Sequence, residues 1–230
     1  MVEKIVFVAK DVIKENERLA MKLREFYDSL GLVAYEFLGG PGSGKTSLIE
    51  KLVERFTSDF SPSELLYIDG DVATSIDSER MSKHGIYTVQ INTGGSCHLE
   101  VPQVKKTLMK LGGRPFLEKI KVMIIENVGN MICPFSFPLG AHARIMVADV
   151  AEGEDKFIKH PLSTRVSDII VINKVDLAEY LGVNIDKMKS DAYEINPRAP
   201  VYLASAKTGY GIDEIYQSLM KLAEKVIRTA

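Results

Sequence analysis

A glycine-rich octapeptide at residues 39–46 has the residue types and spacing of a phosphate-binding loop. It reads Gly-Gly-Pro-Gly-Ser-Gly-Lys-Thr, follows a short apolar run and opens a helical pattern, which is the context that the GxxxxGK[ST] motif requires. Glycines let successive backbone N–H groups point inward, so they form an anion-binding nest at a helix amino terminus. Lys45 would reach the β- and γ-phosphates, and the Thr46 hydroxyl would ligate Mg²⁺. The motif predicts a nucleoside triphosphate site made by Gly39, Gly40, Pro41, Gly42, Ser43, Gly44, Lys45, Thr46 and Ser47.

Two short segments further along the chain predict which base is bound. The first reads Asn-Lys-Val-Asp at residues 173–176 and ends a strand-like run. A carboxylate such as that of Asp176 can accept hydrogen bonds from the ring N–H and the exocyclic amine of guanine, a donor pair that adenine lacks. The second segment follows the next strand-like run and resembles the second guanine-contacting element of the G-protein superfamily. We therefore expect GTP rather than ATP, bound by Asn173, Lys174, Asp176, Ser205, Ala206 and Lys207.

Carboxylates at the ends of two other apolar runs are candidate ligands for Mg²⁺, which prefers hard oxygen donors. Asp71 and Asp77 follow the run 65–68, whereas Asp69 can still belong to that strand. Glu126 closes the run 122–125 and opens Glu-Asn-Val-Gly, where G proteins usually carry Asp-x-x-Gly with a glycine N–H that senses the γ-phosphate. One carboxylate could instead orient the attacking water. The candidate catalytic residues are Lys45, Asp71, Asp77 and Glu126; the candidate Mg²⁺ ligands are Thr46, Asp71, Asp77 and Glu126; and Gly129 is the candidate phosphate sensor.

Cys97, His98 and Cys133 are candidate ligands for a softer metal, because thiolate and imidazole favour Zn²⁺ or Ni²⁺ over Mg²⁺. A structural zinc site needs four protein ligands, and this chain supplies three. Three ligands fit an open site, or a site completed by a second subunit across a two-fold axis. The alternative is two buried thiols and an unrelated histidine. Both segments follow candidate switch loops, where a nucleotide-driven rearrangement would reach the metal.

Composition excludes several classes of protein. Of 230 residues, 46% are hydrophobic and 26% charged, with a formal net charge of -2. These values exclude a disordered or fibrous chain and make nucleic acid or an anionic membrane a poor partner. No apolar stretch approaches the ~20 residues of a membrane span. Two cysteines exclude a disulfide scaffold and suit a reducing cytosol, so we expect a cytoplasmic protein.

Seven short apolar runs alternate with helical patterns beyond residue 31, and near-continuous apolar runs are typical of parallel strands covered on both faces. Ligands of such sheets bind beyond the carboxyl ends of the strands.

Upstream, apolar residues at spacings of three and four predict an amphipathic helix over 11–30, ended by Gly31. We expect an α/β, three-layer P-loop NTPase fold with a mostly parallel seven-stranded sheet. Residues 1–31 would form an amino-terminal extension whose helix packs on the domain, and residues 32–230 the P-loop GTPase domain. The predicted strands are 33–38, 65–68, 87–91, 122–125, 145–150, 169–172 and 201–204.

These motifs together resemble the HypB family, GTPases that help deliver nickel to [NiFe]-hydrogenase. The resemblance is carried by residues 39–46, 70–77, 92–99, 126–134 and 173–176. It implies that Cys97, His98 and Cys133 form a metal site at the interface of a dimer promoted by GTP and metal. It also implies the nickel accessory protein HypA and the hydrogenase large subunit as partners. Because the chain lacks the amino-terminal cysteine motif and histidine-rich tract of many bacterial members, we do not expect tight metal storage at that end.

The resulting hypothesis is a metal-handling switch that uses GTP/GDP, Mg²⁺ and either Ni²⁺ or Zn²⁺. Hydrolysis would be slow, because the phosphate loop contains no arginine finger. Three alternatives remain open. A urease accessory GTPase resembling UreG, of the same dimerising P-loop class, would carry a Cys-Pro-His motif that is absent here. A P-loop small-molecule kinase would prefer ATP. A non-catalytic metal-binding module would keep its function after Lys45→Ala.

Overall fold

Strands and helices alternate along the chain, as the hydrophobic pattern predicts. This computed structural model describes the backbone of residues 2–71 and 76–229, and the side chains of residues 11–70 and 77–228. Its strands are β1 (Val33–Leu38), β2 (Leu65–Asp71), β3 (Tyr87–Asn92), β4 (Val122–Glu126), β5 (Ala143–Asp149), β6 (Ile169–Asn173) and β7 (Val201–Leu203). Its α-helices are α1 (Val2–Asp28), α2 (Lys45–Asp59), α3 (Ile76–Ser82), α4 (Val101–Lys110), α5 (Arg114–Leu117), α6 (Cys133–Ser136), α7 (Lys156–Lys159), α8 (Pro161–Arg165), α9 (Ala178–Leu181), α10 (Ile185–Ile195) and α11 (Ile212–Thr229). Short 3-10 turns lie at η1 (Pro62–Glu64), η2 (Val150–Glu152) and η3 (Val175–Leu177).

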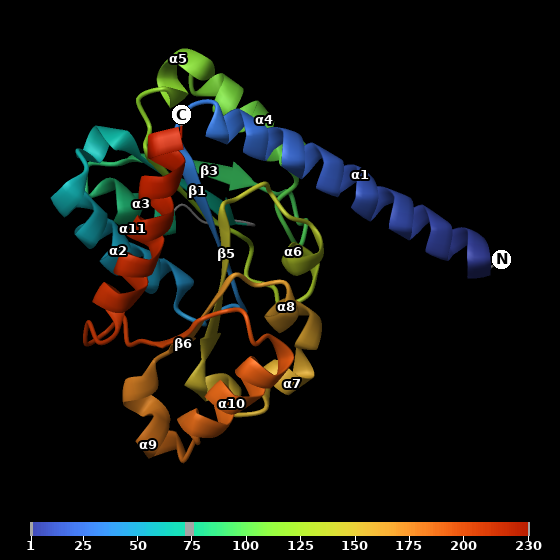
Figure 1. Ribbon diagram of the computed structural model, residues 1–230, viewed down its shortest axis with the longest axis vertical. Helices are drawn as coiled ribbons and strands as arrows, with labels where there is room; N and C mark the ends of the chain where they lie inside the picture. The colour runs from blue at the N-terminus through green and yellow to red at the C-terminus, as the bar shows by residue number, and fades with distance from the viewer. Residues whose placement is uncertain (1, 72–75, 230) are drawn as a thin grey trace.

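The seven strands form one sheet in the order β3-β2-β4-β1-β5-β6-β7, and all their pairings are parallel (Figure 1). After β1 the chain crosses to β2, toward the β3 edge of the sheet, whereas after β5 it crosses to β6, toward the β7 edge. A crevice for a ligand is expected where neighbouring strands diverge in this way, beyond their carboxyl ends. The predicted three-layer α/β fold with a parallel sheet is confirmed. One difference matters for the site: β2 continues to Asp71, so both Asp69 and Asp71 belong to the strand.

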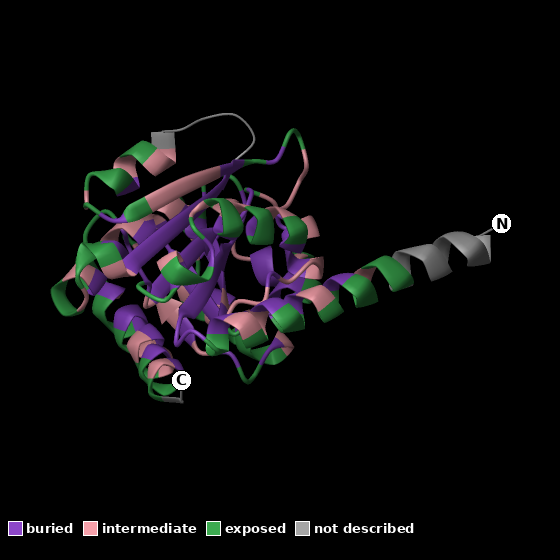
Figure 2. Ribbon diagram, turned by 90° about the horizontal axis from the view of Figure 1, so that it is seen from above, coloured by how far each residue is buried: buried purple, intermediate pink, exposed green. Residues whose placement is uncertain are grey.

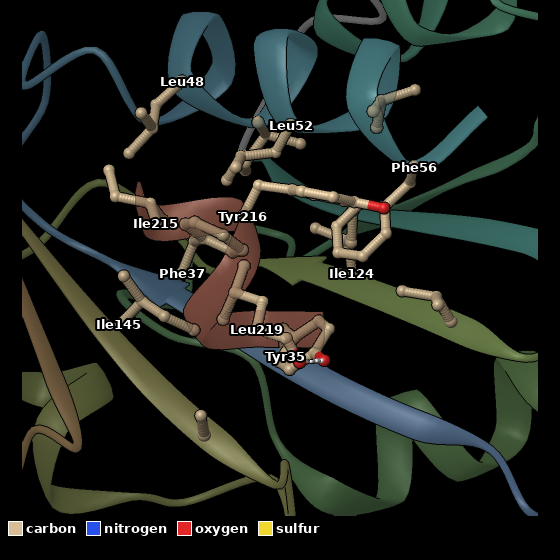
Figure 3. Close-up of a cluster of buried hydrophobic side chains, with 14 of the residues drawn as sticks. Tyr35, Phe37, Leu48, Leu52, Phe56, Ile124, Ile145, Ile215, Tyr216 and Leu219 are labelled. Atoms are coloured by element: carbon tan, nitrogen blue, oxygen red, sulfur yellow. Dashed lines mark hydrogen bonds between the residues drawn. The ribbon is translucent and has the colours of Figure 1, made fainter. Parts of the chain in front are cut away.

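One face of the sheet is covered by α2 and α11 (Figure 3). The apolar side chains of α2 recur on one side of the helix and are fully buried, as are Tyr35 and Phe37 of β1. The Phe56 ring of α2 lies 5.1 Å from the Tyr216 ring of α11 in an edge-on contact, a favoured geometry for aromatic pairs. This packing holds α2, which begins at the phosphate loop, firmly against the sheet.

The opposite face is covered by α1 and α4 over one half of the sheet and by the segment α7–α10 over the other. The helix predicted over 11–30 is longer at its start and ends at Asp28. Its carboxyl-terminal half packs on the domain through Ala20, Leu23 and Tyr27, in the part of the helix that alternates between buried and exposed positions in Figure 2. Toward its amino terminus the helix extends past the rest of the fold (Figure 1). The division between residues 31 and 32 stays a prediction. Within the described chain, no helix has the length and apolarity needed to span a bilayer.

Candidate functional site

The phosphate loop joins the buried end of β1 to the first turn of α2. Lys45 opens α2, is 6% exposed, and donates hydrogen bonds from Nζ to the carbonyl oxygens of Gly39 at 3.3 Å and Gly40 at 3.2 Å. Burial lowers the pKa of Lys45, and the carboxylates Glu126, Glu152, Asp77 and Asp69 oppose that shift. Ser43 Oγ is buried with no hydrogen-bond partner among the described residues. A buried cation and an orphaned hydroxyl beside a helix amino terminus fit a bound phosphate group.

Gly44 lies against Asn173, in the segment predicted to bind the base. Its φ of 87° lies in the left-handed region, and a Cβ there would lie 2.4 Å from Asn173 Nδ2. That nitrogen donates to the carbonyl oxygen of Ser43 at 3.0 Å, and Asn173 Oδ1 accepts from the N–H of Ala206 at 3.3 Å. Asn173 therefore positions the phosphate loop and the 205–207 segment, a role that its place in the motif did not reveal.

We expect Gly44→Ala to lower the free energy of unfolding by roughly 3 kcal/mol and to abolish nucleotide binding. Left-handed strain contributes about 1–2 kcal/mol, and displacement of Asn173 removes hydrogen bonds worth about 1 kcal/mol each. Gly182→Ala is the matched control, since Gly182 has a φ of 65° with open space around it. Denaturant unfolding and GDP titration measure both effects. Equal losses for the two variants would show that backbone strain alone, and not the contact with Asn173, makes Gly44 necessary.

The predicted base-binding residues line one cavity of about 390 Å³ at the carboxyl edge of the sheet. Lys174, held at a φ of 59°, donates from Nζ to the carbonyl oxygen of Gly42 and to Asp149 Oδ2, each at 2.6 Å. Asp176 is exposed at the wall of this cavity, where a base could reach its carboxylate. The predicted residues of the lining are Gly44, Ser47, Asn173, Lys174, Asp176, Ser205, Ala206 and Lys207.

The lining also contains residues that sequence reasoning missed: Glu50, Lys51, Arg80 and Leu177. Arg80 donates to Glu50 Oε2 at 2.5 Å and to Ser47 Oγ at 3.4 Å, which brings α3 against α2 at the mouth of the cavity. Its position three residues after Asp77, on one helical face, was the available signal. It was missed because only the tertiary structure places α3 beside α2.

Glu126 is the candidate Mg²⁺ ligand that contacts Thr46 directly. Glu126 accepts hydrogen bonds from Thr46 Oγ1 at 2.9 Å and from the Tyr67 hydroxyl at 2.7 Å, and burial raises its pKa. Asp69, which is not among the predicted ligands, is buried, lies opposite Glu126 in the β2–β4 register, and accepts from Ser78 Oγ at 3.1 Å.

Asp77 is the second residue of α3, lies 3.6 Å from Arg80, and is a carboxylate whose charge acts on both Lys45 and Glu126. The side chain of Asp71, and Thr74 as a whole, lie outside the described residues. The described carboxylates of this region are thus Glu126, which contacts Thr46, Asp69 on the neighbouring strand, and Asp77, whose charge acts on Glu126. The hard-oxygen donor set suits Mg²⁺.

Cys97, His98 and Cys133 converge although a long stretch of chain separates the first two from the third. The ligand atoms of the three side chains all lie within 4.8 Å of one another. Cys97 and His98 lie between β3 and α4, and Cys133 begins α6. Cys97 Sγ is 3.5 Å from His98 Nδ1, and the imidazole stacks on the Phe137 ring at 4.4 Å between centroids. Burial lowers the pKa of His98, which favours the neutral imidazole that binds metal.

The chain is similar to proteins of one family along most of its length. Residues 34–203 match the family profile described as CobW/HypB/UreG, nucleotide-binding domain. The probable hydrogenase maturation factor HypB of Methanocaldococcus jannaschii is 44% identical over 222 residues, covering 96% of this chain and 97% of that protein. The crystal structure of HypB from Archaeoglobus fulgidus matches with a TM-score of 0.82 at 41% identity, covering 91% of this chain and 99% of that one. The crystal structure of HypB from Helicobacter pylori in complex with nickel matches with a TM-score of 0.83 at 34% identity, covering 92% and 96%. Fold, phosphate loop and whole-length identity agree: this chain belongs to the HypB group of the CobW/HypB/UreG family.

Proposed function

We propose that this chain binds and hydrolyses GTP as a nickel metallochaperone switch in the maturation of [NiFe]-hydrogenase. The observation that carries the proposal is the direct connection between the two sites through the segment that follows β4. Glu126, at the end of β4, is hydrogen-bonded to Thr46 of the phosphate loop, and the same loop that leaves Glu126 leads to Cys133. The HypB of Helicobacter pylori, crystallised in complex with nickel, supports a nickel cargo.

Phosphate binding would act first on Lys45. A γ-phosphate offers stronger acceptors than the carbonyl oxygens of Gly39 and Gly40, so the ammonium group would turn toward it. Thr46 and Glu126 would hold Mg²⁺, which supplies positive charge to the β- and γ-phosphate oxygens. Asp77 or Asp69 would orient the attacking water. Hydrolysis would be slow, since the nearby Arg80 is paired with Glu50 instead of aimed at the phosphates.

Three protein ligands leave a nickel ion with open positions. In the proposed cycle, GTP and metal bring two copies of the chain together, and hydrolysis loosens the pair so that nickel passes on. The HypA accessory protein and the hydrogenase large subunit are the proposed partners, in the cytoplasm. Zn²⁺ fits the same thiolate and imidazole ligands, so it is the competing ion.

Titration of Ni²⁺ into the GDP form and the GTP-analogue form tests the switch. We expect the two forms to bind Ni²⁺ with different affinities, and we expect Cys97→Ala to lose Ni²⁺ binding in both forms. Identical isotherms would reject the coupling. Mass in solution with GDP, and then with a GTP analogue plus Ni²⁺, tests the dimer separately.

A second candidate function is delivery of nickel to urease. The Helicobacter pylori relative, 33% identical over 219 residues, is named a hydrogenase/urease maturation factor. Nickel-loaded protein presented to apo-hydrogenase and to apo-urease in parallel would decide between the acceptors.

Base preference gives a further prediction. We expect Asp176→Asn to weaken GTP binding by about 100-fold, because the amide nitrogen cannot accept a hydrogen bond from guanine and the remaining oxygen acceptor carries no charge. Xanthine nucleotides should gain affinity, since the amide can donate to the additional carbonyl oxygen of that base. Displacement of labelled GDP by GTP, XTP and ATP measures the preference, with Asp186→Asn, an exposed aspartate of α10, as control. Displacement by ATP as effective as by GTP in the parent protein would favour the kinase alternative.

A further inference from the structure

An ion pair of Glu36 with Arg144 joins two neighbouring strands of the sheet and belongs to neither the phosphate loop nor the lining of the predicted base-binding cavity. Glu36 is fully buried on the central strand β1, and Arg144 Nε of the neighbouring strand β5 lies 3.3 Å from Glu36 Oε2. The adjacent same-face residues Ala34 and Leu38 belong to two separate apolar clusters. A buried pair of this kind often stabilises a fold no better than apolar residues of the same size. Its presence between two apolar clusters therefore calls for another explanation.

The first connection from Glu36 leads to the Cys97–His98 side of the metal cluster. Asn127 is 1% exposed and donates from Nδ2 to Glu36 Oε1 at 2.8 Å. Its Oδ1 accepts from the N–H of Leu99 at 3.0 Å and from that of Val128 at 2.9 Å. Asn127 directly follows Glu126, so one amide joins the phosphate-sensing segment 126–129 to the residue after His98.

The second connection leads to the Cys133 side. Arg144 donates from a terminal nitrogen to the carbonyl oxygen of Pro134, the residue after Cys133, at 2.8 Å. Its backbone N–H donates to Asp168 at 2.8 Å, which anchors β5 at this point. One carboxylate, Glu36, thereby holds both halves of the metal cluster, one through Asn127 and the other through Arg144.

We propose that Asn127, Glu36 and Arg144 are positioning residues that set the spacing of Cys97 and His98 from Cys133 according to the bound nucleotide. The inference rests on the proposed function. Any movement of segment 126–129 toward a γ-phosphate moves Asn127, and both ends of its amide are engaged with Leu99 and Glu36. The Leu99 end then shifts relative to Pro134, which Arg144 holds against the sheet. The metal ligands follow, because they are the chain neighbours of Leu99 and Pro134.

The test is the double variant Glu36→Gln/Arg144→Met, which keeps volume and removes both buried charges, while the introduced amide oxygen can still accept from Asn127. We expect unchanged GDP and GTP-analogue affinities without metal, and an unchanged melting temperature within a few degrees. The ratio of Ni²⁺ affinities between the two nucleotide forms, expected to be at least about fivefold in the parent protein, should fall below about twofold. Reciprocity requires that the effect of Ni²⁺ on GTP-analogue affinity falls by the same factor. Arg114→Met/Glu118→Gln, which removes an exposed ion pair of α5 and the residue after it, is the matched control.

The possible results lead to different conclusions. If the folded double variant keeps the parent protein's ratio of Ni²⁺ affinities between the two nucleotide forms, the positioning role is overturned and the proposed switch stands. If the parent protein binds Ni²⁺ with equal affinity in the two nucleotide forms, the proposed switch fails and the positioning role fails with it. If the double variant does not fold, Asn127→Ser provides the second measurement, because it cuts the link to Leu99 and leaves the ion pair intact. A folded Asn127→Ser protein with the parent ratio would also overturn the inference.

Discussion

Replacing Lys45 by alanine lowers the rate of GTP hydrolysis by about 10²- to 10³-fold, the expected loss when one charge-stabilising donor is removed from a preorganised site. Lys45 is the buried cation of the loop, and its carbonyl partners Gly39 and Gly40 are weak substitutes for a phosphate. Without it, the developing charge on the γ-phosphate oxygens has one fewer donor. Phosphate release under single-turnover conditions, with nucleotide in excess of its dissociation constant, measures the effect.

Lys110→Ala, which removes an exposed lysine of α4, is the control for loss of a positive charge alone. The Lys45→Ala variant also separates function classes. Metal binding should persist in it, whereas the dependence of that binding on the GTP analogue should vanish. A variant that hydrolyses GTP at the parent rate would mean that the loop does not hold the reacting phosphate, and the GTPase proposal would fall.

Replacing Cys133 by alanine weakens Ni²⁺ binding by more than about 100-fold. Loss of an outer partner of a metal ligand already costs 10- to 100-fold in affinity, so loss of a ligand itself costs at least the upper value. Cys133 is the sole ligand of the cluster that comes from α6, and the only other cysteine in the chain, Cys97, is already a member of the cluster. Equilibrium competition with a chelator of known affinity, under reducing conditions, measures the change.

His160→Ala is the matched control, because His160 lies between α7 and α8 and is not among the three clustered ligands. GDP affinity should stay at the parent value in Cys133→Ala. Parent-like Ni²⁺ affinity in this variant would place the metal elsewhere on the chain and remove the basis of the proposed switch.

The central strands were predictable because they are short apolar runs covered on both faces, whereas the edge strand β3 has only Ile91 buried. The predicted run 33–38 has the same bounds as β1, because five of its six residues are apolar and glycines follow it directly. Boundaries were less secure where polar residues end a strand. Asp69 and Asp71 both continue β2, because hydrogen bonds to β3 and β4 extend the strand past its apolar part. That extension places Asp69 beside Glu126.

The short helices α3 and α6–α9 were not predicted. Each has too few residues for a periodic apolar pattern, and each is held by contacts with distant segments. Arg80 was missed for this reason, since its partners Ser47 and Glu50 lie on α2.

The sequence by itself determined the phosphate loop, the segment predicted to bind the base, the three candidate soft ligands and the parallel sheet. These are local patterns, in which residue type and spacing along the chain carry the chemistry. Only the tertiary structure decided that Cys133 meets Cys97 and His98, that Asn173 holds the phosphate loop, and that Glu36 links Asn127 to Arg144. The physical reason is that parallel strands bring residues far apart in sequence to neighbouring positions, and side-chain hydrogen bonds between strands have no signature along the chain.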